Sequence, residues 1–279
     1  MTALEDDINL RDKLVASSPK LKAWKDIVRG LSMYPVWWGL AWLEIKQRYS
    51  RSMIGPFWIT LSMAIMIGAM GPLYGALFGQ NVSSYIQHLA VSLIMWNFIS
   101  TCINEAGSVF IGAENYIKQV SMPFSVYVFK LIAKNFLILS HNAVIGVVVL
   151  ILLPPQNLQS IFLFPIGLIL VIGNLCWFVL LVGMFSGRFR DLPQLVTNIM
   201  QVMFFLSPIL WTADMLPDNR RYLAMLNPLY HLIEVVRSPL LGYATPTLSW
   251  VLCFGFLFAG GVGSFFIYAR YRSRIPYWL

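Results

Sequence analysis

Long apolar segments without charge are the feature that most constrains how this chain can fold. Residues 54–78 contain no Asp, Glu, Lys or Arg. The same is true of five further segments, residues 86–103, 135–153, 161–185, 193–211 and 248–269. The hydrocarbon core of a bilayer requires roughly 20 apolar residues in a helix. The pattern therefore predicts an all-α membrane protein with six transmembrane helices.

The composition agrees with a membrane protein and excludes a soluble enzyme. Of the 279 residues, 58% are hydrophobic and only 11% are charged, and the mean hydropathy is +0.69. A soluble domain carries about 25% charged residues because water must cover its surface. The net charge is +8, but the basic residues flank the apolar segments. We interpret them as topology signals rather than as a nucleic-acid site.

The distribution of Lys and Arg predicts the orientation of the chain. Nine of these residues precede residue 54, others lie after the second and fourth apolar segments, and the C-terminus carries three. The connections after the first and third segments carry none. Under the positive-inside rule, both termini face the cytoplasm. Arg220, Arg221 and Arg237 are the exception, since they fall on the outer side.

Three parts of the chain are expected from this pattern. Residues 1–33 form a charged cytoplasmic tail that becomes partly helical from Ser18, residues 34–52 form an amphipathic interfacial helix, and residues 53–279 form the six-span domain. In the interfacial helix, Trp38 and Trp42 share one stripe, and Arg48 and Arg51 lie opposite. Such a helix holds its tryptophans in the headgroup zone and its cations outward.

Polar features near the spans give two further expectations. Lys130 and Lys134 lie one turn apart just before the third span and are expected to extend to the interface. Between the fifth and sixth spans, Asn227 and Pro228 open a short helix, which we expect to re-enter the outer leaflet. A backbone break at membrane depth requires cover by protein or a water-filled cavity.

The sequence contains no recognisable motif for nucleotide binding, catalysis or metal binding. It contains no phosphate-binding loop, no nucleophile elbow and no zinc-protease motif, and its three histidines lack ligand spacing. We expect no catalytic residue, no metal site and no resident cofactor. ATP and magnesium would then be used by a partner subunit.

Aromatic and charged residues at the span ends are the candidates for a transport channel or its outer exit. They are Trp58, Tyr74, Trp211, Tyr230, His231, Glu234 and Arg237. The alternative for the aromatic residues is core packing or the membrane-interface belt. Glu234 and Arg237 are three residues apart on one predicted helix, where they can pair with each other. They either line the outer exit and hold it closed or form a surface ion pair of small effect.

Several motifs in fixed order resemble a known family. They are residues 40–49 (LAWLEIKQRY), 55–59 (GPFWI), 115–124 (NYIKQVSMPF), 189–193 (FRDLP), 227–237 (NPLYHLIEVVR) and 274–279 (RIPYWL). Together they resemble the permease subunit of type-2 ABC exporters of bacterial cell-surface polysaccharide, most closely the O-antigen branch. The resemblance runs from about residue 30 to the end.

The resemblance implies a homodimer in the bacterial inner membrane, paired with two copies of a separate ATPase. It implies export of an undecaprenyl-diphosphate-linked polysaccharide. It also implies that a short helix couples the permease to the ATPase; this helix carries Asn115, Tyr116, Ile117 and Lys118. The amphipathic helix with Trp38, Trp42, Arg48 and Arg51 would border the site where the lipid-linked substrate enters.

Two alternatives stay open. The same fold could export capsule, teichoic acid, a lipid or a drug. A membrane-embedded transferase is the alternative from another class, and it would need a set of catalytic acids or histidines near the interface. The sequence does not reveal the sugar repeat.

Overall fold

The computed structural model describes residues 18–279 except 51, 56, 156 and 158, and this part of the chain is helical without strands. The long helices are α4 (Phe57–Leu77), α5 (Val82–Ala106), α7 (Ser125–Leu152), α8 (Phe164–Arg188) and α12 (Thr247–Tyr271). The others are α2 (Pro19–Ser32), α3 (Tyr34–Arg48), α6 (Glu114–Gln119), α9 (Leu192–Leu206), α10 (Tyr222–Met225), α11 (Pro228–Leu241) and α13 (Ile275–Trp278). Five 3₁₀ turns complete the order: η1 (Ile111–Ala113), η2 (Gln159–Leu163), η3 (Ala213–Met215), η4 (Asp218–Arg220) and η5 (Arg272–Arg274).

Within the described residues, five helical segments are long and apolar enough to cross a membrane. The chain is thus an all-helical, multi-pass membrane protein, as the sequence predicts. The predicted fifth span is the exception, because α9 has only 15 residues. At 1.5 Å per residue, α9 covers about 22 Å, less than the roughly 30 Å hydrocarbon core. Helix α9 ends because Ser207 is extended before Pro208, as the residue before a proline usually is.

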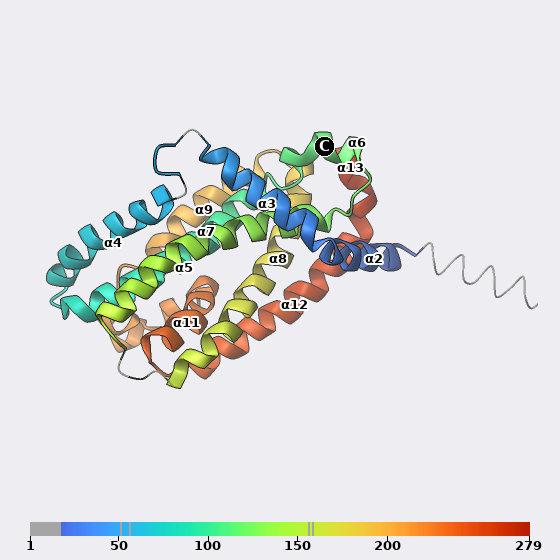
Figure 1. Ribbon diagram of the computed structural model, residues 1–279. Helices are drawn as coiled ribbons and strands as arrows, with labels where there is room; N and C mark the ends of the chain where they lie inside the picture. The colour runs from blue at the N-terminus through green and yellow to red at the C-terminus, as the bar shows by residue number, and fades with distance from the viewer. Residues whose placement is uncertain (1–17, 51, 56, 156, 158) are drawn as a thin grey trace, which may run out of the picture.

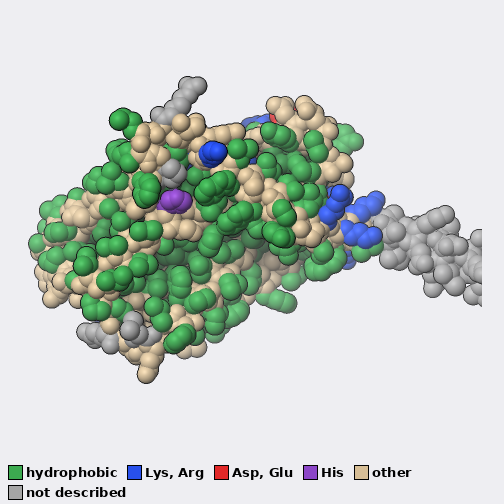
Figure 2. All heavy atoms as spheres, in the orientation of Figure 1, with side chains coloured by type: hydrophobic (Ala, Val, Ile, Leu, Met, Phe, Trp, Pro, Cys, Tyr) green, Lys and Arg blue, Asp and Glu red, His purple; other side chains and the backbone are tan. Residues whose placement is uncertain are grey.

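Helix α5 is the centre of the bundle. It packs against α4, α7, α8, α9 and α11, and most of its residues are buried. Helices α4 and α12 lie at the periphery and expose long rows of apolar side chains. Hydrophobic side chains accordingly cover most of the face in Figure 2. Exposed apolar surface of this extent is expected where lipid or a second membrane protein covers it.

Helix α8 approaches α11 very closely. A Cβ atom built on Gly167 would lie 2.1 Å from the carbonyl oxygen of Val235. Only glycine fits at this contact, because any side chain would meet the backbone of α11. The close approach fixes α11 against the bundle.

Local signals set the ends of two functional helices. The Ser18 hydroxyl accepts a hydrogen bond from the Leu21 amide at the start of α2 (3.2 Å). The Asn227 side chain accepts one from the Leu229 amide at the start of α11, and Pro228 occupies the first turn. Helix α11 ends at Gly242, which has a left-handed backbone (φ 78°). These caps follow the ordinary rules for helix ends.

The bundle has two ends, which we name by their contents. The basic end carries α2, α3, α6 and α13, and the α11 end carries α10, α11 and the start of α5 (Figure 1). Helix α3 crosses the bundle at the basic end, where it packs on α7. Both described termini, residues 18 and 279, lie at the basic end.

Candidate functional site

A short polar segment projects between α5 and α7 at the basic end. It consists of η1 and α6 and contains all four predicted coupling residues. Asn115, Tyr116 and Lys118 are exposed, and Tyr116 is 63% exposed. Ile117 is half-buried and packs against the core, so it anchors the segment. The structure therefore presents a polar face with an apolar anchor, a shape suited to docking.

Helix α6 carries one internal ion pair. Lys118 Nζ lies 2.6 Å from Glu114 Oε1, one turn earlier. The hydrogen bond from Lys118 and its charge lower the pKa of the exposed Glu114 carboxyl. A surface pair of this kind adds little stability, so the position of α6 depends on its neighbours.

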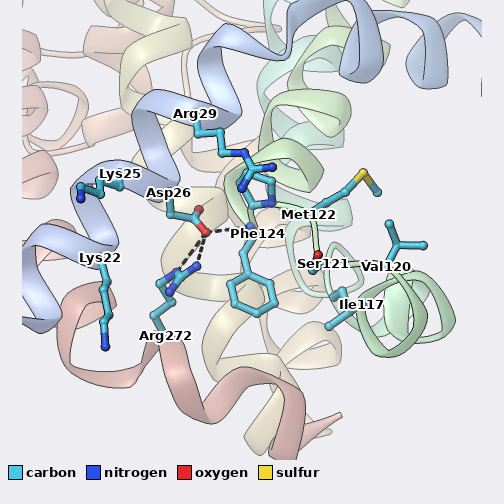
Figure 3. A pocket seen from close by; sticks show the side chains of 11 residues that line it. Lys22, Lys25, Asp26, Arg29, Ile117, Val120, Ser121, Met122, Phe124 and Arg272 are labelled. Atoms are coloured by element: carbon cyan, nitrogen blue, oxygen red, sulfur yellow. Dashed lines mark hydrogen bonds and ion pairs between the residues drawn. The ribbon is translucent and has the colours of Figure 1, made fainter. Parts of the chain in front are cut away.

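Asp26 on α2 provides that support. Its carboxylate is fully buried and accepts hydrogen bonds from the amides of Phe124 and Ser125 (3.1 Å each), which follow α6 in the chain. It also accepts a bond from the Tyr268 hydroxyl (2.8 Å) and two from Arg272 (3.0 and 2.7 Å). One carboxylate thus joins α2, the N-terminus of α7 and the end of α12 (Figure 3). A carboxylate at a helix N-terminus also meets the favourable end of the helix dipole.

A cavity of about 480 Å³ opens beside this junction. Lys22, Lys25 and Arg29 line one side of it, and Met122 and Phe124 line the other. Figure 3 shows these side chains around the Asp26–Arg272 pair. The pair is internally neutral, so the three remaining basic residues give the cavity a positive charge.

A network of charges ties α3 to α5 and α7. Glu44 Oε2 lies 2.9 Å from Lys130 Nζ, and Glu44 Oε1 lies 2.9 Å from Lys134 Nζ. Lys134 also contacts Glu105 at 2.7 Å, and Arg48 lies 3.7 Å from the same carboxylate. Burial alone would raise the pKa of Glu44, but the hydrogen bonds and charges of the two lysines outweigh it and lower the pKa.

This network corrects one expectation. Lys130 and Lys134 do not extend freely to the interface, because both pair with Glu44 and only 7% of the Lys134 side chain is exposed. The sequence rule for lysines near span ends assumes lipid or water as the alternative. Here an acidic residue on α3 offers a better partner.

Within the segment predicted as an interfacial helix, residues 34–52, the structure has helix α3 over Tyr34–Arg48. Ala41 and Ile45 are buried against α7, whereas Trp38 and Trp42 are 42% and 54% exposed at the sides of that contact. Arg48 is near the end of α3, and its side chain is 46% exposed. Arg51 lies outside the described residues.

A polar pocket of about 320 Å³ lies next to the end of α3. Two predicted residues line it: Arg48, expected at the substrate entry, and Trp58, a candidate for the channel or its exit. Asn97 and Asn142 contribute amides at its inner side, 3.4 Å apart. The Asn142 side-chain oxygen is buried and has no hydrogen-bond partner among the described residues. Arginine, tryptophan and amide groups together suit a phosphate- or sugar-bearing headgroup.

At the α11 end, Arg237 is the hub of a buried network. Its guanidinium donates to Ser92 Oγ (2.9 Å) and to the Pro208 carbonyl (2.6 Å), and it pairs with Glu234. Only 6% of the Arg237 side chain and 13% of the Glu234 side chain are exposed. The surface-pair alternative is therefore wrong. The pair links α11 to α5 and to the chain after α9.

The other channel candidates are dispersed. His231 is buried, its two ring nitrogens facing Ser249 Oγ (2.9 Å) and the Met225 carbonyl (2.7 Å). Tyr230 is also buried. The ring of Tyr74 packs at a tilt of 31° against that of Phe78, whereas Trp211 donates to the Phe205 carbonyl and lines an apolar cavity of about 450 Å³. Among these candidates, Glu234 and Arg237 form an ion pair, and the rings of Tyr230 and His231 lie 5.0 Å apart.

The described residues contain no group of three His, Cys, Asp or Glu side chains able to hold a metal ion. All three cysteines are free.

Asp26 and Glu105 are functional candidates that the sequence alone did not indicate. Asp26 stands among four basic residues of α2, and an isolated acid in such a segment is a signal that can be searched for. Nothing in the sequence reveals that α2 packs on α12, which lies far along the chain.

Five helical segments of the described chain, each long and apolar enough to cross a membrane, define a multi-pass membrane protein. The family model for ABC-2 type transporters matches residues 35–241, which is most of the chain. The chain belongs to the ABC-2 type transporter family.

Curated relatives carry a common description. The O-antigen export system permease protein RfbA of Myxococcus xanthus is 22% identical over 196 residues, which cover 68% of this chain and 74% of that protein. Two Klebsiella pneumoniae proteins of the same description are each 23% identical. They align over 194 residues (68% of this chain, 74% of that protein) and 229 residues (76% and 83%).

Proposed function

We propose that this chain is the membrane subunit of an ATP-driven exporter of an O-antigen-like polysaccharide. It works as a homodimer with two copies of a separate ATPase in the bacterial inner membrane, and its cargo is linked to undecaprenyl diphosphate. The observation that carries the proposal is the docking segment α6. It is exposed, polar and held by a buried carboxylate at the end where both termini lie.

The proposed orientation puts the basic end in the cytoplasm. Most Lys and Arg residues of the described chain gather there, as the positive-inside rule requires. The ATPase, which uses cytoplasmic ATP, then meets α6 directly.

We also propose six membrane crossings, with α9 as the fifth. Helix α9 starts at the basic end and α12 starts at the α11 end, so the chain between them must traverse the bundle. The hydrogen bond from the Tyr85 hydroxyl to the Leu210 carbonyl (2.6 Å) supports this path, because Tyr85 lies near the start of α5. The five non-helical residues 207–211 need to add only about 8 Å to the roughly 22 Å of α9 to reach the roughly 30 Å of the hydrocarbon core.

A polar stripe on α9 supports a dimeric pathway. Gln194, Thr197, Asn198 and Gln201 recur at helical spacing on an otherwise apolar helix. All four are exposed. Polar groups at membrane depth are costly against lipid and require protein or water. A second copy of the chain facing this stripe would enclose a hydrated route.

The most specific part of the proposal is the identity of the exported cargo. The relatives' descriptions favour O-antigen over capsule, teichoic acid, lipid or drug. The polar pocket with Arg48 and Trp58 is suited to the diphosphate and first sugars of a lipid-linked glycan.

Docking is tested with Tyr116→Asp. The full-length permease is co-expressed with the ATP-binding cassette protein of the proposed exporter, and the complex is recovered by pull-down. The variant should lose the ATPase while its membrane level stays normal. Tyr222→Asp, an equally exposed tyrosine at the α11 end, is the matched control and should keep it. Unchanged recovery with Tyr116→Asp would refute the docking role.

Cargo is tested in the host. Loss of the gene should remove the long-chain surface polysaccharide on an immunoblot and leave its lipid-linked precursor inside the cell. Normal surface polysaccharide would refute the assigned cargo class.

A further inference from the structure

Helix α2 has three distinct faces. Ala23, Asp26 and Gly30 are buried against the bundle. Trp24, Val28 and Leu31 recur at intervals of four and three residues and are all exposed. Lys22, Lys25 and Arg29 recur at three and four residues on the remaining face. With 3.6 residues per turn, each set occupies about a third of the helix circumference.

The basic face lines the cavity of about 480 Å³ described above. Its opposite wall is mostly apolar and includes Ile117, Met122 and Phe124, together with the polar Ser121. In the part of the chain that the structure describes, the three basic residues form no ion pair. In Figure 2, blue side chains cluster where α2 lies. A positive wall facing an apolar wall fits a molecule with an anionic head and an apolar body.

The exposed apolar face lies against a membrane span. The Trp24 ring packs on Phe265 of α12 with centroids 6.4 Å apart, and Lys20 Nζ lies 5.0 Å from the centre of the Phe266 ring. Phe266 is 50% exposed and precedes the end of α12 by five residues. At 1.5 Å per residue, this contact lies about 8 Å inside the end of the span. Helix α2 therefore sits at the depth where an interfacial helix meets lipid headgroups.

We infer that α2 is a membrane-surface helix that binds an anionic phospholipid headgroup in the cavity formed by Lys22, Lys25 and Arg29. Its apolar face lies among acyl chains beside α12, and its basic face holds the lipid phosphate. That this end of the bundle faces the cytoplasm rests on the proposed function. The phospholipid bound in the cavity is distinct from the transported cargo. A lipid there contacts the inner side of the docking segment and stabilises its position.

Lipid binding is measured on the full-length permease purified in detergent. It is titrated with phosphatidylglycerol and with phosphatidylcholine, and bound lipid is counted by native mass spectrometry. Each basic residue near an anionic surface contributes roughly fivefold in affinity. The variant Lys22→Gln/Lys25→Gln/Arg29→Gln should therefore lose about 100-fold in affinity for phosphatidylglycerol. Its affinity for phosphatidylcholine should change little.

The control variant loses the same number of positive charges at the basic end of the bundle. Lys46→Gln/Arg270→Gln/Arg274→Gln alters three exposed basic residues away from the cavity and should keep the preference for phosphatidylglycerol. Equal loss in both variants, or no loss in either, overturns the inference. Displacement of the lipid by millimolar inorganic phosphate also overturns it, because that result would identify a free-anion site.

Two further experiments distinguish the phospholipid from other possible occupants of the cavity. If the cavity variant keeps its lipid affinity but loses the ATPase in pull-down, the cavity belongs to the protein interface. The second arm replaces the acidic residues Glu5, Asp6, Asp7 and Asp12 by Asn or Gln. Unchanged lipid affinity supports the inference, whereas a rise of tenfold identifies the chain's own acidic segment as the occupant. Failure of cargo export in the host, by contrast, bears only on the proposed function.

Discussion

Replacing Asp26 by Ala should destabilise the permease and release its docking segment. The substitution removes five hydrogen bonds from the carboxylate and leaves Arg272 and the α7 amides without their partner. Breaking a buried ion pair costs about 3–5 kcal/mol. Because 29% of the Arg272 side chain is exposed, water can replace part of the interaction, and we expect about 3 kcal/mol.

That loss corresponds to a fall in Tm of about 6–12 °C for a chain of this size. The measurement is thermal unfolding of the full-length permease in nanodiscs. Asp191→Ala is the matched control, since Asp191 is exposed at the same end and makes no side-chain cap. It should shift the Tm by less than about 2 °C.

A double-mutant cycle isolates the Asp26–Arg272 contact. Arg272→Met combined with Asp26→Ala should cost about 0.5–3 kcal/mol less than the sum of the single changes. The Asp26→Ala variant should also bind the ATPase more weakly, although no residue of α6 has changed. A Tm shift below 2 °C, or strictly additive effects, would refute the role of Asp26 as the junction of three helices.

Three further predictions follow from other contacts. Glu44→Gln should lower the Tm at pH 7. The difference in Tm from the unaltered protein should shrink as the pH falls below 4.5 and vanish below the lowered pKa of Glu44, because protonation removes the same charge. A difference in Tm that stays constant with pH would contradict this. Gly167→Ala should reduce the yield of folded protein, measured by monodisperse elution, because its Cβ would meet the Val235 carbonyl oxygen; a normal yield would show that α8 and α11 can separate freely. Glu234→Ala and Arg237→Ala should each reduce surface polysaccharide at matched permease levels, and the exchange Glu234→Arg/Arg237→Glu should restore part of it; unimpaired export in both single variants would exclude a gate.

Much of the helical framework could be predicted from the sequence because lipid imposes a simple rule. Uncharged apolar segments become helices, so the positions of α4, α5, α7, α8 and α12 follow from the pattern. The short α9 breaks the rule. Its apolar segment continues through Ser207 and Pro208, but proline ends the helix there. Hydropathy measures apolarity and does not report where the backbone leaves the helix.

The candidate site was less accessible to sequence reasoning. The exposed face of α6 and the cap of α11 are local features, and both were predicted. The contacts that fix them are long-range: Asp26 meets Arg272 across most of the chain, and Glu44 meets Lys134 from another helix. Arg237 illustrates the same limit, since its partner Glu234 is local but Ser92 and Pro208 are not. Pairing over such separations depends on helix packing, which a single sequence does not encode in a readable pattern.

The central claim is that this chain exports a lipid-linked polysaccharide only when an ATPase docks on α6. The most direct measurement reconstitutes the purified permease and its ATPase in proteoliposomes that contain the lipid-linked glycan. Glycan that reaches the face opposite the ATPase is detected with a membrane-impermeant glycosidase. Cleavage should rise with ATP when both subunits are present, and it should stay at background with the permease alone or with Tyr116→Asp. ATP-dependent cleavage that persists with Tyr116→Asp, or ATP hydrolysis by the permease alone, would contradict the account.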